Sequence, residues 1–178
     1  MAQLIITAVG PDRPGIVGEL TAHLHDAGGN ILDSRMVNLR GEFAMMILVD
    51  LADADASARL ADALPAQGRQ MGLRLSVTPQ ESATGKPQQG GIPYRLKTYS
   101  MDQPGIVAKL TSVLREHGVN IEELSAWQES AAFSGSPLFL TEMVLTVPPT
   151  APLAKLRGEL TTLSNQINCD VDLEPAEG

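Results

Sequence analysis

DRPGIVGELTAHLHDAGGNI, residues 12–31, returns as DQPGIVAKLTSVLREHGVNI at residues 102–121. Eleven of the twenty aligned positions are identical, whereas unrelated segments would share about one or two. The chain therefore contains an internal duplication. For a chain of 178 residues, the duplication predicts two small modules rather than one large domain.

Each copy of the repeat is preceded and followed by strand-like segments. Residues 2–10 are apolar and rich in β-formers, which predicts a strand. Apolar residues then recur at helical spacing from Ile16 to Ala27, and Gly28 is expected to end this helix. In the rest of the first half, residues 30–40 and 43–51 predict a hairpin, and residues 73–79 predict a closing strand. Residues 53–64 predict a helix that is capped by an Asp and kinked or ended by Pro65.

The second half repeats the same six elements, so the predicted order is β-α-β-β-α-β twice. Right-handed crossovers fold such a unit into a ferredoxin-like α+β module, a four-stranded antiparallel sheet with both helices on one face. Residues 80–91 are rich in Gly, Pro and Gln and predict a linker, which places the modules at 1–79 and 92–178. The second hairpin is expected to carry the longer loop, at 129–137.

Composition narrows the possible partners. The formal net charge is −8, with seven basic against ten acidic residues over 1–90 and six against eleven over 91–178. Neither half is suited to holding phosphate backbones. One cysteine allows no intrachain disulfide framework, and no apolar run reaches the length of a membrane span. We expect a cytoplasmic protein that binds neither nucleic acid nor membrane directly.

The repeated turn joins a strand to a helix. Asp12 is expected to cap the first N–H groups of the helix, Pro14 to occupy an early helical position, and Gly15 to let another group approach the backbone. A helix N-terminus also attracts carboxylates. The same residues make an ordinary helix start, and an Asn after a helix-ending Gly is often only a turn residue. Retention in both copies, at Asn30 and Asn120, favours a ligand role, because an amide both donates and accepts hydrogen bonds.

The motif D-x-P-G-I-V followed by G-x-N-I resembles the signature of ACT domains, small βαββαβ modules that bind amino acids and regulate enzymes or transcription. In that family the ligand lies near the first turn and the start of the second strand, often between two modules. The resemblance therefore implicates seven residues, with Arg13 counted in the first site: Asp12, Arg13, Gly15, Asn30, Asp102, Gly105 and Asn120. Because Gln103 replaces Arg13 and Val119 replaces Gly29, the two sites are expected to differ in ligand, or one to be vestigial.

The same resemblance implies a regulatory protein, not an enzyme. Its expected ligand is a small amino acid, glycine or serine, and it acts through a protein partner such as a transcription factor in the control of glycine metabolism. Pairing of the modules into one eight-stranded sheet and homodimerisation are also expected. A regulatory subunit acting in trans on a metabolic enzyme is the alternative, and a small hydrolase is less favoured because no catalytic triad or phosphate loop is present.

No cofactor or metal site is expected. His23 and His25 point away from each other on a helix and are not a chelating pair. His117 is interpreted as a surface histidine at a helix end, and Cys169 as a small core residue.

Overall fold

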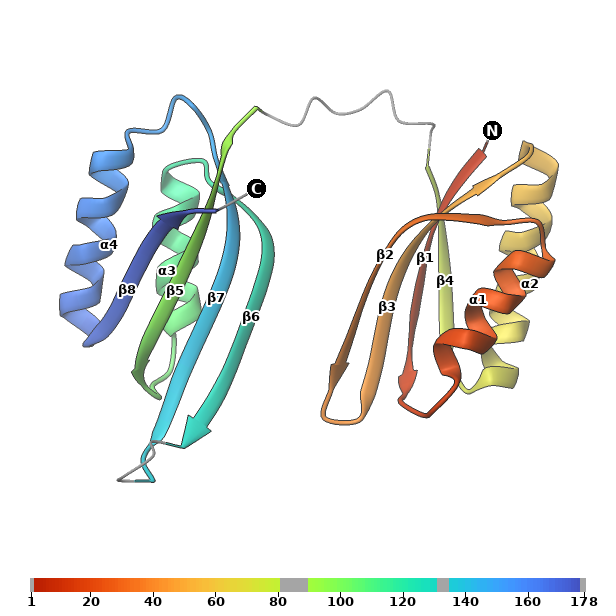
Figure 1. Cartoon of the computed structure of the whole chain (residues 1–178), viewed down its shortest axis with the longest axis horizontal. Coiled ribbons are helices and arrows are strands. Elements are labelled where there is room, and N and C mark those ends of the chain that lie inside the picture. The colour runs from red at the N-terminus through yellow and green to blue at the C-terminus, as the bar shows by residue number, and fades with distance from the viewer. Residues whose placement is uncertain (1, 81–89, 131–134, 177–178) are drawn as a thin grey trace. The chain divides into compact units, whose positions relative to one another are not determined.

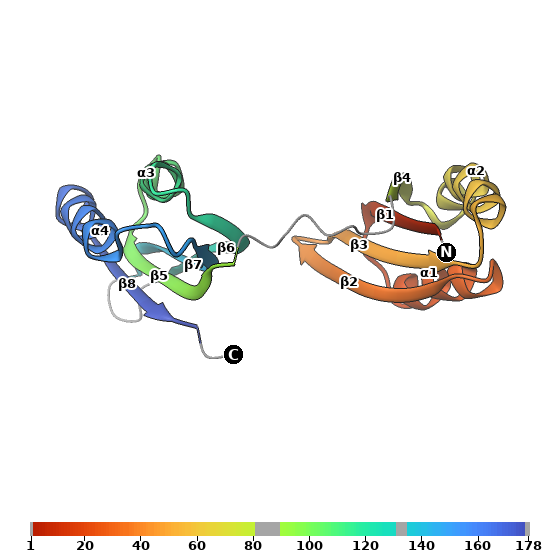
Figure 2. The ribbon, with the colours of Figure 1, turned by 90° about the horizontal axis from the view of Figure 1, so that it is seen from above.

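The computed structural model describes residues 2–80, 90–130 and 135–176. The chain divides into two compact units, Met1–Gly85 and Lys86–Gly178. Each has a four-stranded antiparallel sheet with two helices on one face, so the predicted α+β ferredoxin-like fold is confirmed for both (Figures 1 and 2). Residues 81–89 of the expected linker and 131–134 of the expected long loop lie outside the described residues. The module boundaries at 79 and 92 stay a prediction.

The order of elements is the same in the two units. Unit 1 comprises β1 (Ala2–Pro11), α1 (Ile16–Asp26), β2 (Asn30–Leu39), β3 (Glu42–Leu51), α2 (Ala54–Met71) and β4 (Arg74–Gln80). Unit 2 comprises β5 (Ile92–Met101), α3 (Ile106–Glu116), β6 (Asn120–Ser130), β7 (Pro137–Val147), α4 (Leu153–Ile167) and β8 (Cys169–Pro175). The strands lie in the orders β2-β3-β1-β4 and β6-β7-β5-β8. Within the described residues, β2 and β6 are therefore edge strands.

Alternate side chains of each sheet build the core beneath the helices. In β1, Leu4, Ile6 and Ala8 are buried, while the residues between them face the helix-free side and are only half-buried. Among the described residues, the largest fully buried side chain is Phe43 at the start of β3. Each unit has its own cluster of buried apolar residues, which are mainly aliphatic.

Helix α2 does not end at Pro65. It continues to Met71, because the buried stripe of Leu60 and Leu64 extends past the proline to Gly68. Pro65 itself is exposed, so the hydrogen bond that it cannot make lies on the solvent side. The predicted cap of this helix is confirmed: Asp53 accepts a hydrogen bond from the backbone N–H of Ala56 at 2.7 Å.

His117 is not a surface residue. Its side chain is 5% exposed, and its Nε2 lies 2.8 Å from Oε2 of Glu159. The contact joins the end of α3 to the middle of α4. The hydrogen bond with His117 and, to a smaller extent, the charges of His117 and Lys155 lower the pKa of Glu159 from its ordinary value.

We expect Glu159→Gln to make the free energy of unfolding of unit 2 fall less steeply as the pH is lowered. A carboxylate with a lowered folded pKa stabilises the fold above its unfolded pKa, and this contribution is lost as pH falls through the folded pKa. Urea unfolding between about pH 3 and pH 7, followed by tryptophan fluorescence, measures the slope. Glu116→Gln, at the exposed end of α3, is the control. An unchanged slope for Glu159→Gln would contradict the expected role of the His117 contact.

Candidate functional site

The repeated turn places a glycine at the N-cap of each first helix. Helix α1 begins at Ile16 after Gly15, whose φ is +87°, and α3 begins at Ile106 after Gly105, whose φ is +88°. Residues that carry a side chain rarely adopt such φ values, which explains why glycine stands there in both copies. Among the described residues, and apart from the neighbours in the chain, no atom would lie within 4 Å of a Cβ on either glycine. The space over both turns is therefore open.

Asp12 does not cap the helix, contrary to the sequence prediction. Within the described residues no side chain caps the first turn of α1 or α3, and Pro14 precedes the cap rather than lying in the helix. Asn38 Nδ2 instead donates to Oδ2 of Asp12 at 2.5 Å. Gln128 donates to Asp102 in the same way at 2.7 Å. The aspartate thus links the turn to the C-terminal end of the edge strand, which is separated from the first strand of the unit by one strand.

Arg13 fastens the turn to the end of the second helix. Its two terminal nitrogens donate to the Glu19 carboxylate at 2.6 and 2.5 Å, and one also donates to the carbonyl of Met71 at 3.3 Å. The hydrogen bond with Glu19 raises the pKa of Arg13, and the hydrogen bond with Arg13 lowers the pKa of Glu19. In unit 2, Gln103 donates to the carbonyl of Ile167 at 2.5 Å. Gln103, which stands in place of Arg13, therefore keeps the hydrogen bond to the end of the second helix and loses only the ion pair.

The two repeated asparagines differ in their partners. Asn30 is exposed at the start of β2, and among the described residues its side chain makes no hydrogen bond. Asn120 donates to Oε1 of Glu122 at 2.7 Å, and the hydroxyl of Thr146 donates to the same oxygen at 2.8 Å. Both hydrogen bonds lower the pKa of Glu122, and the one from Asn120 has the larger effect. Within the part of the chain that the structure describes, Asn120 is thus engaged by a neighbouring side chain and Asn30 is not.

A β-bulge follows both asparagines. The pairing of β2 with β3 shifts between Ile31 and Asp33, and that of β6 with β7 shifts between Ile121 and Glu123. The inserted residue is Leu32 in one copy and Glu122 in the other. Glu122 was missed by the sequence reasoning, although it lies directly after the repeated Asn-Ile pair.

One module alone does not bring the predicted site residues together. Asp12 and Gly15 follow Pro11, which pairs with Glu42. Asn30 pairs with Asp50 at the opposite end of the same sheet. Helix α1, of 11 residues, spans about 16 Å between the two ends. A ligand as small as an amino acid therefore cannot contact the turn and the asparagine of the same module.

Unit 2 has an open cavity beside Asn120. Its volume is about 1540 Å³, and its lining includes Arg115 of α3, Glu122 and Thr146. Gly105 does not line it. The cavity thus lies at the asparagine end of the module and not at the turn.

The described part of the chain adds two negative observations. None of its helices has the length and apolar character needed to cross a membrane. No group of three or more His, Cys, Asp or Glu side chains among these residues is placed to hold a metal ion. Cys169 is buried, in agreement with its interpretation as a core residue.

Comparisons with known proteins bear directly on the repeated turn. The ACT-domain family model matches residues 2–78. A Methanopyrus kandleri protein, UPF0237 protein MK1213, is 38% identical over 78 residues, which are 43% of this chain and 87% of that protein. The chain belongs to the ACT-domain family. Since unit 2 repeats the turn and the element order of unit 1, this is a tandem ACT-domain protein.

Similarity extends over both ACT modules in two further proteins. The glycine cleavage system transcriptional repressor of Escherichia coli K12 is 28% identical over 165 residues, which cover 93% of this chain and 85% of the repressor. The crystal structure of an unknown protein from Galdieria sulphuraria superposes with a TM-score of 0.81 at 29% identity, covering 99% of each chain. This ACT-domain protein therefore resembles the repressor in sequence along nearly its whole length.

Proposed function

We propose that this protein senses an amino acid and regulates gene expression through a protein partner, in the control of glycine metabolism. The observation that carries the proposal is the likeness to the E. coli repressor across both modules, since a single ACT module would fit many regulated proteins. The acidic charge of both halves supports action through a protein rather than through DNA. Regulation of a metabolic enzyme in trans is the alternative.

The open turns suit the carboxylate of the ligand. The first N–H groups of α1 lack a side-chain cap, and the positive end of the helix dipole favours an anion there. Asp12 already accepts from Asn38, and Arg13 is held by Glu19. We therefore assign the carboxylate to the backbone at Gly15, with Asp12 as the neighbouring acid for the ammonium.

A second copy of the chain would supply the missing asparagine. Strand β2 is an edge with open backbone groups, and an antiparallel edge pair places the start of one strand beside the end of the other. With the two-fold axis at Ser34, Asp33 lies opposite Arg35 of the second copy. Asn30 then lies opposite Asn38 of the second copy, the residue that binds Asp12. The proposed homodimer would thus unite the turn and the amide in one site.

Unit 1 is the better candidate for the working site. Its edge strand exposes Met36, Val37 and Leu39. These apolar side chains can pack against those of a second β2 strand that pairs with this edge. Strand β6 carries Glu122, Glu123 and Glu129 and no basic residue, so like charges would oppose its self-pairing. Asn120 is also engaged with Glu122. Pairing of the two modules into one sheet stays a prediction.

Titration calorimetry of the full chain tests the proposal. We expect glycine or serine to bind with a dissociation constant of about 10 µM to 1 mM, the range of a modest set of charge-assisted bonds. Asn30→Ala should weaken binding about tenfold or more, because the amide loses both its donor and its acceptor. Sedimentation of the same samples measures dimerisation.

Asn120→Ala is the matched control, since it removes the equivalent residue of the second copy. It should leave the heat of binding unchanged. If none of the twenty amino acids gives heat at millimolar concentration, the sensing function is wrong. Loss of binding only in Asn120→Ala would move the site to unit 2.

A further inference from the structure

The helix-free face of the second sheet carries a row of large side chains. Tyr99 of β5 pairs with Leu140 of β7, which pairs with Trp127 of β6. Directly paired residues project from the same face of a sheet. Tyr99 is 46% and Trp127 38% exposed, while Leu140 between them is half-buried. The three line a hollow of about 420 Å³.

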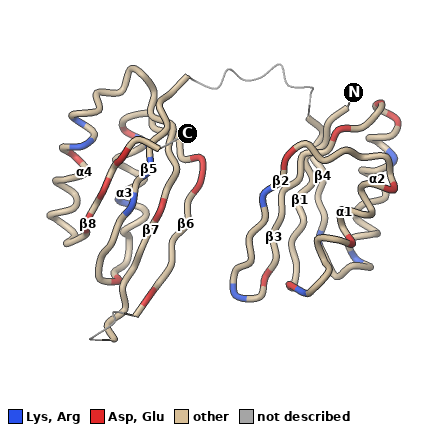
Figure 3. Tube along the Cα trace, in the orientation of Figure 1, with Lys and Arg blue, Asp and Glu red and all other residues tan. Residues whose placement is uncertain are grey.

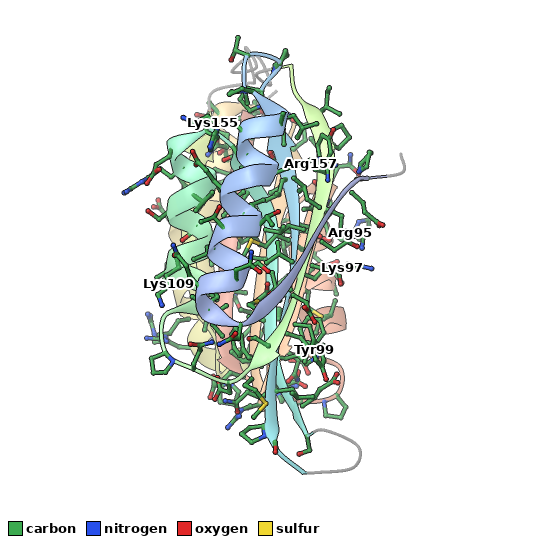
Figure 4. The ribbon with its side chains drawn as sticks, turned by 90° about the vertical axis from the view of Figure 1, so that its left-hand side faces the viewer. Arg95, Lys97, Tyr99, Lys109, Lys155 and Arg157 are labelled. Atoms are coloured by element: carbon green, nitrogen blue, oxygen red, sulfur yellow. The ribbon has the colours of Figure 1, made fainter. Side chains whose placement is uncertain are left out.

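The arrangement of β5 shows that this face is open. Arg95, Lys97 and Tyr99 follow one another along β5 on the side away from α3 and α4, whereas Lys155 and Arg157 belong to a helix (Figure 4). Within the described residues no helix of unit 2 covers these side chains.

Acidic residues surround the aromatic row. Arg95 is ion-paired with Glu142, and Trp127 Nε1 donates to Oε1 of Glu129 at 2.8 Å. Strand β8 adds alternate carboxylates opposite β5 (Figure 3). Six acidic residues thus share the face with two basic ones, Arg95 and Lys97: Glu123, Glu129, Glu142, Asp170, Asp172 and Glu174. The face has a net negative charge.

The same face of unit 1 has a different character. Val9, Ala44 and Val37 occupy the register positions of the aromatic row. Arg74 pairs with Val9 where Asp170 pairs with Tyr99. The fold therefore requires neither the aromatic side chains nor the carboxylates, because the first copy forms the same sheet without them.

We propose that this face of unit 2 docks a basic segment of a partner protein. An aliphatic or aromatic anchor of that segment would lie between Tyr99 and Trp127, and its Lys and Arg side chains would face the carboxylates. Tyr and Trp dominate the binding energy of many interfaces, and an acidic surface speeds association with a cationic partner. This inference rests on the proposed function, which requires a protein partner. It adds the surface of unit 2 that the partner would contact and the chemistry of the segment that would bind there.

Two other occupants fit the observations less well. Aromatic side chains on an open sheet can stack nucleobases, but the excess of carboxylates repels phosphate. A second copy of unit 2 would bring two acidic faces together. A basic peptide is the one class that both the apolar row and the charge favour.

Trp127 makes a direct test possible, because it is the single tryptophan of the chain. Its fluorescence in the full chain would be titrated with a capped peptide of sequence Lys-Arg-Leu-Phe-Arg-Lys. We expect a saturable change with a dissociation constant of about 10–100 µM at low salt, rising as salt is added. Replacing the cations by Glu and Asp, or the two anchors by Ser and Gly, should weaken binding about tenfold or more.

Variants of the face complete the test. Tyr99→Ser should weaken the basic peptide about tenfold, and Asp170→Asn with Asp172→Asn about threefold or more. Val9→Ser, at the equivalent position of unit 1, is the matched control and should leave binding unchanged. Circular dichroism checks the fold of each variant.

The proposal is overturned if the acidic peptide binds as tightly, if a thymidine decanucleotide binds more tightly, or if the fluorescence depends on protein concentration alone. It is likewise overturned if the basic peptide gives no saturable change up to about 1 mM. Calorimetry with glycine separates the two hypotheses. Peptide binding without any amino-acid heat would overturn the sensing function and support the docking face, and the reverse result would do the opposite.

Discussion

Phe43→Ala is expected to destabilise unit 1 by about 3–5 kcal/mol. Phe43 is 0% exposed, and it pairs with Gly10 on one side and with Asn38 on the other. Truncation would leave a cavity beneath the repeated turn. The aliphatic side chains that surround this cavity would fill it only in part. Urea unfolding followed by far-ultraviolet circular dichroism measures the loss.

Phe139→Ala is the matched control, because Phe139 holds the equivalent place between Ser100 and Gln128. It is only half-buried, so its removal should cost clearly less. Since Trp127 lies in unit 2, Phe43→Ala should shift the dichroism transition of unit 1 and leave the fluorescence transition in place. Equal shifts of both signals would show that the two units unfold together.

Gly29→Val should destabilise unit 1 by about 2–3 kcal/mol, although the second copy has Val119 at this position. A Cβ on Gly29 would lie 2.7 Å from Cγ1 of Val49 and 2.9 Å from the carbonyl oxygen of Leu24. The carbonyl belongs to the backbone at the end of α1 and cannot turn away. The start of β2 would therefore have to move.

Gly18→Ala is the control for this substitution, and it also introduces the residue of the second copy, Ala108. A Cβ on Gly18 would meet no atom within 4 Å among the described residues outside its own helix backbone and chain neighbours, so the change should raise stability by about 0.5–1 kcal/mol through helix propensity. Thermal unfolding of both variants measures the difference. A neutral Gly29→Val would mean that β2 can shift without cost.

Local patterns were sufficient to predict the fold. The spacing of apolar residues from Ile16 to Leu24 and the alternation in β1 report directly on which side of an element is buried, and the duplication supplies the module twice. The helix beyond Pro65 was missed because burial of Leu64 and Gly68 against the sheet outweighs one lost hydrogen bond. Such packing depends on residues distant in the sequence.

The candidate site was predictable only in part. The open glycine turn and the exposed Asn30 follow from their immediate neighbours in the chain. The partner of Asp12 does not, since Asn38 lies 26 positions away and reaches it only through the hairpin. The burial of His117 against Glu159 has the same origin, because their separation of 42 positions leaves no periodic signal.

The bulge at Leu32 also bears on aggregation. Strand β2 exposes apolar side chains along an open edge, the arrangement that recruits further strands into amyloid-like stacks. The inserted residue interrupts the ladder between Ile31 and Asp33, and such interruptions twist an edge away from flat stacking. Removing Leu32 would restore a continuous ladder with Val49 and Leu48. A chain shortened by this one residue would keep its fold and lose much of its protection against fibre growth.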